Sequence, residues 1–225
     1  MRSVASRFAP YQELAEHLLQ ATISEPMDAA HDVGHLLRVW GNAERLMAEE
    51  GGDRSVLTAA TLLHDCVHVP KDSPLRLSAS SMAAEKAGRV LDSLNWTAGD
   101  VEKVRHAIEA HSFSAGIVPT TLEAKILQDA DRLDAIGHIG IARCFHVSGQ
   151  MNRPICDLFD PGADRRALDD RAFAMDHFQT KLLTLTGSFQ TATGRRLARV
   201  RHDKVRDFLN GLLEEVLPDA MTVSH

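Results

Sequence analysis

Apolar residues recur at intervals of three and four positions through most of the chain, which is the spacing of helices with one buried face. This pattern predicts helices over residues 10–22, 28–47, 53–65, 78–94, 98–111, 122–147, 169–185 and 190–217. Asp28, Asp53 and Thr97 are suited to cap the start of three of these helices, and Gly51 follows the second. Runs of β-branched residues are scarce, so the chain is expected to be all-α.

The longest predicted helix, over residues 122–147, runs through Gly137 and Gly140. Each glycine lowers helix stability by about 1 kcal/mol relative to alanine, which suggests that helices pack closely there. Residues 150–168 contain Asn152, Pro154 and Pro161 and are expected to be an irregular linker or lid.

Composition narrows the class of protein. With 225 residues, 44% of them hydrophobic, the chain can bury one large core. Its net charge of −6 argues against a protein that holds nucleic acid through its phosphates. Three cysteines without close spacing argue against a disulfide framework. No apolar stretch is long enough for a membrane span and no signal peptide is evident at the N-terminus, so we expect a cytoplasmic protein, as a monomer or homodimer.

One apolar helical run ends unusually, in the sequence Leu62-Leu63-His64-Asp65. A carboxylate beside such a run begins partly buried, where it is costly unless it is paired, and a metal ion would relieve that cost. The alternative is a buried His–Asp hydrogen bond. His-Asp pairs also occur at residues 31–32 and 202–203, and the latter lies in a run of charges typical of a solvated helix face.

His35 upstream and Asp131 downstream extend this candidate site to two nitrogen and two oxygen donors from three helices. Such a set suits manganese, iron, cobalt, nickel, zinc or magnesium in an open octahedral site. A divalent ion with open positions can lower the pKa of a bound water toward about 7 and polarise a phosphoryl oxygen. The donor set therefore favours hydrolysis of a phosphoester or phosphoanhydride.

The order His35, His64-Asp65, Asp131 resembles the signature of the HD-domain metal-dependent phosphohydrolases. Longer strings resemble the bacterial YpgQ/YedJ branch, namely residues 31–39, 62–65, 110–113, 123–134 and 177–183. The likeness covers about residues 10–215. It implies an all-α HD helical bundle over residues 10–150, with a lid or linker and C-terminal helices over 151–217 packing on it as one structural unit. It also implies one divalent metal ion, manganese first, and nucleotide pyrophosphohydrolase activity on nucleoside triphosphates.

The resemblance assigns roles to individual residues. His35, His64, Asp65 and Asp131 match the metal ligands, and we count Asp65 as catalytic too. His31 would reach the phosphate or protonate a leaving oxygen, unless it is a capping histidine, and Asp134 would orient a ligand or water. Asp129 is expected to be a carboxylate on the helix surface. The expected substrate-binding residues are His111, Arg132, His177 and Lys181, although His177 can equally be a packed helix histidine.

Several alternatives stay open. The same site could serve a nucleotide phosphomonoesterase or an alarmone hydrolase, or bind a nucleotide as a sensor without turnover. A two-metal oxygenase would require both His106 and His111 as ligands, which the number of metal ions per chain would reveal. A cyclic-dinucleotide phosphodiesterase of the Gly-Tyr-Pro kind is disfavoured because Tyr11 is the only tyrosine.

Overall fold

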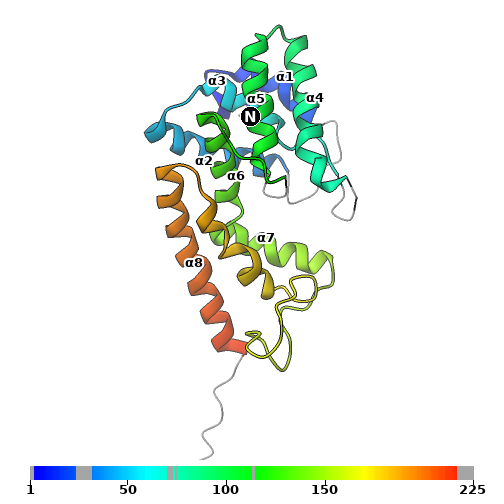
Figure 1. The fold of residues 1–225 in the computed structure, drawn as a ribbon, viewed down its shortest axis with the longest axis vertical. Coiled ribbons are helices and arrows are strands. Elements are labelled where there is room, and N and C mark those ends of the chain that lie inside the picture. Colours follow the sequence, from blue (N-terminus) through cyan, green and yellow to red (C-terminus); the bar gives the residue numbers. More distant parts are fainter. Residues whose placement is uncertain (1–2, 24–31, 70–72, 74, 113–114, 217–225) are drawn as a thin grey trace, which may run out of the picture. The chain divides into compact units, whose positions relative to one another are not determined.

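The protein is described here by a computed structural model, which covers residues 3–23, 32–69, 73, 75–112 and 115–216. These residues form helices joined by turns and irregular segments, and none of them lies in a β-strand (Figure 1). The prediction of an all-α fold is therefore confirmed. Within the same ranges, no helix combines the length and the apolar character that a bilayer crossing requires.

The helices follow one another along the chain, and a long irregular segment separates α7 from η3. In chain order they are η1 (Val4–Phe8), α1 (Gln12–Ile23), α2 (Val33–Glu50), α3 (Arg54–Leu63), η2 (Arg76–Ser78), α4 (Ala79–Ser93), α5 (Ala98–His111), α6 (Leu122–Asp134), α7 (Gly137–Gln150), η3 (Phe178–Leu182), η4 (Leu185–Ser188) and α8 (Ala192–Val216). Of the short ones, η3 is a π-helix and the other three are 3-10 helices.

Side-chain caps fix where three of the long helices begin. Asp53 accepts hydrogen bonds from the backbone of Ser55 and caps α3, and Thr97 caps α5, as the sequence predicts. The start of α2 differs from the expectation. Its cap is Asp32, which accepts from the backbone N–H of His35 at 2.9 Å, whereas Asp28 lies outside the described residues. Asp32 therefore places His35 in the first turn of α2.

The single helix predicted over residues 122–147 is wrong, because α6 ends at Asp134 and α7 begins at Gly137. Gly137 has a φ of +73°, a left-handed conformation that glycine adopts without strain. A Cβ atom at Gly140 would overlap the backbone of Ala135, only 2.7 Å from its carbonyl carbon. The two glycines thus permit a sharp turn between helices.

The helix predicted over residues 169–185 is also wrong in part. The chain stays irregular up to Asp176, a buried carboxylate that accepts from Arg166 at 2.5 and 2.8 Å and from the backbone N–H of Asp169 at 2.6 Å. These bonds hold the segment in a loop, and helical structure resumes only at Asp176, directly before η3. The irregular segment expected from residue 150 is present, and it extends further than predicted.

The chain divides into two compact units, and the division falls inside α6. The first unit contains residues up to Asp131 together with Gln190–Gly194; in it α4 packs along α5, and α3 contacts α1, α2 and α5. The second contains Arg132–Phe189 and the residues from Arg195 onward. Its apolar core gathers Ile141, Cys144, Met175, Phe178, Leu182, Val205 and Leu209. The proposed functional division after residue 150 stays a prediction.

Candidate metal centre

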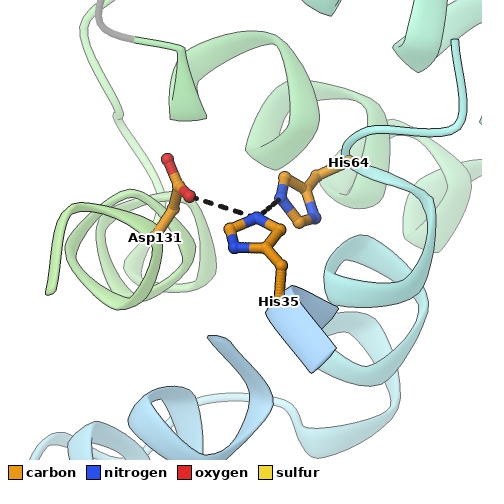
Figure 2. Close-up of side chains that lie close together, drawn as sticks. All are labelled: His35, His64 and Asp131. Carbon is orange, nitrogen blue, oxygen red and sulfur yellow. Dashed lines mark hydrogen bonds and ion pairs between the residues drawn. The ribbon is translucent and has the colours of Figure 1, made fainter. Parts of the chain in front are cut away.

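His35 and His64 form the buried centre of the candidate site, and both belong to the first unit. His35 lies in the first turn of α2, and His64 directly follows the last residue of α3. Their Nε2 atoms are 3.2 Å apart, as Figure 2 shows. Two buried imidazoles from different helices therefore turn the same ring nitrogen toward one point.

Two carboxylates border these imidazoles and remain partly open to solvent. Asp131 comes from α6, and its Oδ1 lies 3.5 Å from Nε2 of His35 (Figure 2). The Oδ2 of Asp65 lies 3.4 Å from Nε2 of His64 and 3.7 Å from Nε2 of His35. The side chains of Asp65 and Asp131 are 30% and 27% exposed, so this side of the site is the one that solvent can reach.

The ring of His64 is fixed in one tautomer. Its Nδ1 lies 2.8 Å from the carbonyl oxygen of Thr61, an acceptor, so Nδ1 carries the proton and donates it. Burial lowers the pKa of His64 to about 4; the carboxylate of Asp65 opposes this shift, and the neighbouring imidazoles reinforce it. At neutral pH the Nε2 of His64 therefore presents a lone pair to the site.

The donor set fits a divalent cation. One ligand atom from each of His35, His64 and Asp131 lies within 4.8 Å of the others, and the same holds for His64, Asp65 and His111. Neutral imidazole nitrogens and carboxylate oxygens together suit first-row divalent metals and magnesium. The two carboxylates, Asp65 and Asp131, also supply negative charge that a cation would balance. We conclude that these residues could hold one metal ion.

His111 and His106, on α5, take different positions. The Nε2 of His111 lies 3.7 Å from Oδ1 of Asp65, and its ring packs edge-on against His64 at 4.9 Å. The Nε2 of His106 instead accepts a hydrogen bond from the backbone N–H of Thr120 at 2.9 Å. His106 belongs to neither ligand group found among the described residues. The two-metal alternative that requires both histidines therefore loses one of its ligands.

The residues of the candidate site lie in the part of the chain that matches a known protein family. The model of the HD domain matches residues 32–136, a range that contains every donor described above. The protein YpgQ of Bacillus subtilis is 31% identical over 192 residues, which cover 84% of this chain and 85% of YpgQ. The chain belongs to the HD-domain family. The resemblance drawn from the local strings is thereby confirmed.

Solved structures of HD-domain relatives share the fold over nearly the whole chain. An HD-superfamily hydrolase from Bacillus thuringiensis aligns with a TM-score of 0.69 at 30% identity, over 91% of this chain and 97% of that one. The structure of Bacillus subtilis YpgQ in complex with ADP aligns with a TM-score of 0.68 at 28% identity, over 96% and 98% of the two chains. These alignments therefore include residues of both units.

The remaining residues expected near the HD site have partners of their own. Arg132 is 8% exposed and donates from Nη1 to the carbonyl of Ser188 at 2.5 Å. Asp134 is buried and lies 3.4 Å from Nη1 of Arg143. Both expected residues belong to the second unit, and their predicted roles toward substrate and ligand stay predictions.

His177 and Lys181 also lie in the second unit. Nδ1 of His177 donates to Oδ2 of Asp170 at 3.0 Å, and burial lowers the pKa of His177 more than this carboxylate raises it. Lys181 lies in the π-helix η3 with an exposed side chain. His31 lies outside the described residues, so its predicted role as an acid or phosphate contact rests on the sequence.

Two buried polar residues of the HD core were not assigned a role from the sequence. Asn42 lies seven residues after His35 on α2 and donates to the carbonyl of Ala130 at 2.9 Å. Asp129 is fully buried, so the expectation of a surface carboxylate is wrong. A signal for Asn42 was present, since an amide on the apolar face of a helix needs a buried partner. The partners of Asp129 are more than 60 residues away in sequence, so a local sequence pattern could not predict them.

Proposed function

We propose that this HD-domain protein is a divalent-metal-dependent phosphohydrolase that cleaves a nucleoside triphosphate to the monophosphate and pyrophosphate. The observation that carries the proposal is the convergence of two buried imidazoles and two half-buried carboxylates, His35, His64, Asp65 and Asp131. Similarity to an HD-superfamily hydrolase supports hydrolysis, and the ADP complex of YpgQ supports a nucleotide as the ligand. Manganese is the proposed ion, with cobalt, nickel, iron, zinc and magnesium as alternatives.

In this proposal, the four residues hold the ion, and the rest of the first unit fixes their orientation. Once bound, a divalent ion lowers the pKa of a water molecule and polarises a phosphoryl oxygen. The hydrogen bond from His64 to Thr61 keeps the Nε2 lone pair of His64 directed into the site. The hydrogen bond from the backbone N–H of His35 to Asp32 holds the backbone of His35 in place. Asp65, partly open to solvent, is the proposed acceptor for the proton that the attacking water loses.

His111 is proposed to contact the substrate or its water. Its Nδ1 donates to the carbonyl of Ile108 at 2.5 Å, so the Nε2 of the neutral ring can only accept a hydrogen bond. A phosphate oxygen also accepts, whereas a water or a ribose hydroxyl can donate. We therefore assign His111 to a water or a hydroxyl group. Lys181, an exposed cation, stays the phosphate contact predicted from the sequence.

The test is an analysis of products from a panel of nucleoside and deoxynucleoside triphosphates. Protein stripped with a chelator would be supplied with manganese, cobalt, nickel or magnesium, and phosphorus NMR would separate pyrophosphate from orthophosphate. We expect metal-dependent release of pyrophosphate, and a loss of at least a hundredfold in kcat for Asp65→Ala. The relative rates would also rank the bases and sugars.

Other products would replace the proposal with a named alternative. Orthophosphate released from monophosphates would identify a phosphomonoesterase. Pyrophosphate released only from a 3′-diphosphorylated alarmone would identify an alarmone hydrolase. Nucleotide binding without turnover under every metal would identify a sensor and contradict the enzyme.

A further inference from the structure

Asp129 is a fully buried carboxylate that takes no part in the candidate metal centre. It lies two residues before Asp131 on α6, so the two side chains point in nearly opposite directions. Its Oδ1 accepts from the backbone N–H of Gln190 at 2.8 Å. Its Oδ2 accepts from the backbone N–H of Thr191 at 2.8 Å and from the hydroxyl of Thr191 at 2.7 Å. Three hydrogen bonds thus join α6 to a distant segment of the chain.

The segment that Asp129 binds, Gln190–Gly194, is itself held tightly within the first unit. The N–H of Thr193 donates to Oε1 of Glu50 at the end of α2, at 2.6 Å, and the N–H of Gly194 donates to the hydroxyl of Thr191 at 2.9 Å. A Cβ atom at Gly194 would lie 2.8 Å from both Cγ of Asp129 and Oγ1 of Thr191. We call Asp129 together with Gln190–Gly194 the clasp.

The same turn of α6 is also held by α2. Nδ2 of the buried Asn42 donates to the carbonyl of Ala130, the residue between Asp129 and Asp131, at 2.9 Å. Asn42 lies two turns after His35 on α2. The backbone beside Asp131 is therefore tied to the helix that carries His35, and the clasp holds the side chain of Asp129 in the same turn.

We propose that Asp129 is a positioning residue, and that the clasp sets the rotation of α6 at which Asp131 meets His35. A carboxylate about 6 Å from a helix axis moves by about 1 Å when the helix rotates by roughly 10°. Metal–ligand distances tolerate deviations of only about 0.2 Å. A rotation too small to unfold the unit would therefore weaken metal binding. This inference rests on the proposed metal site. It adds Gln190–Gly194 to the residues that hold the ligands of that site in position.

The test measures manganese affinity in chelator-stripped protein, with free Mn²⁺ followed by electron paramagnetic resonance. Asp129→Asn replaces one acceptor oxygen by an amide that faces N–H donors. Thr191→Val removes the hydroxyl bond to Asp129 and the acceptor for the N–H of Gly194, and keeps both backbone bonds to Asp129. We expect a loss of affinity of about tenfold to a hundredfold for Asp129→Asn, as is typical for groups that orient ligands, and a smaller loss for Thr191→Val. Thr191→Ser, which keeps the hydroxyl, should restore wild-type affinity. Thr191→Val keeps the test decisive where Asp129→Asn does not fold.

A matched control separates positioning from general stability. Asp176 is likewise a buried carboxylate that accepts a backbone N–H, but it lies in the second unit. Asp176→Asn should lower the melting temperature at least as much as Asp129→Asn and leave manganese affinity unchanged. Equal affinity in wild type, Asp129→Asn and Thr191→Val would overturn the inference while leaving the metal site intact. Failure of the wild type to bind manganese or any other divalent ion would instead contradict the proposed function.

Discussion

At the scale of single residues, the partner of one ring nitrogen decides what the other can do. Nδ1 of His64 and Nδ1 of His111 each donate to the carbonyl of a residue three positions earlier, and both Nε2 atoms lie near Asp65. In His106 it is Nε2 itself that accepts a bond, from Thr120. Histidines of one helix thus differ in their availability to a metal ion.

Replacing His106 should therefore affect stability but not metal binding. In His106→Ala we expect one manganese ion per chain with wild-type affinity, and a loss of about 1 kcal/mol in the free energy of unfolding, from the bond to Thr120. His64→Ala serves as the comparison and should lose manganese binding. Metal titration and urea denaturation measure the two effects, and weakened binding in His106→Ala would return the two-metal alternative to consideration.

The sequence could predict which side chains meet at the site but not how all of them are held. The order His35, His64-Asp65, Asp131 predicts which side chains lie together, because each residue lies next to a helix end or in a strongly patterned helix. The clasp could not be foreseen, since the pairing of Asp129 with Thr191 depends on a tertiary contact between distant segments.

At the scale of elements, capping residues in the sequence predict where helices begin, whereas glycines did not reveal the break between α6 and α7. Asp53 and Thr97 begin α3 and α5 as expected because an N-cap bond is local. The separation of α6 from α7 depends on the left-handed backbone of Gly137. A glycine permits that conformation without requiring it, so the sequence alone allows either one helix or two.

Substituting Gly137 tests this explanation. Gly137→Ala should lower the free energy of unfolding by about 2 kcal/mol, because alanine is strained at positive φ and its Cβ would lie 3.1 Å from the side chain of Arg201. Gly149→Ala is the matched control: it lies within α7 with open space around its Cα, and the change should stabilise the protein by up to about 1 kcal/mol. Urea unfolding followed by circular dichroism measures both, and equal effects of the two substitutions would contradict the assigned turn.

At the scale of the whole molecule, the long segment after α7 is ordered by carboxylates that accept several hydrogen bonds, and not by helical structure. Backbone N–H groups, first that of Arg165, lower the pKa of Asp160, and the bond from His177 lowers the pKa of Asp170. Burial acts to raise the pKa of Asp176, but the bonds from Arg166 and the backbone of Asp169 lower it below its ordinary value. Helical periodicity predicts the fold class but cannot predict this loop, whose order comes from hydrogen bonds to the carboxylates of Asp160, Asp170 and Asp176.

These pKa values predict sensitivity to acid. A carboxylate whose pKa is lower in the folded than in the unfolded state stabilises the fold above the unfolded value, here near 4, and loses that contribution as the pH falls through the folded value. Unfolding free energies should fall gently from about pH 6.5, where His64 and His177 take up protons in the unfolded but not in the folded state, and more steeply near pH 4, where the carboxylates lose their contribution. Asp176→Asn should cost about 2–4 kcal/mol at neutral pH and flatten the dependence below pH 4. If the free energy of unfolding depends on pH in the variant as it does in the wild type, Asp176 contributes nothing to the acid sensitivity.

The central claim is that one divalent ion at His35, His64, Asp65 and Asp131 governs hydrolysis. The most direct test is a calorimetric titration of manganese into chelator-stripped protein, with pyrophosphate release measured on the same samples. We predict one ion per wild-type chain, activity that rises with occupancy of that site, and the loss of both in His64→Ala and Asp131→Ala. Binding retained in these variants, or hydrolysis that persists in the stripped protein, would contradict the account.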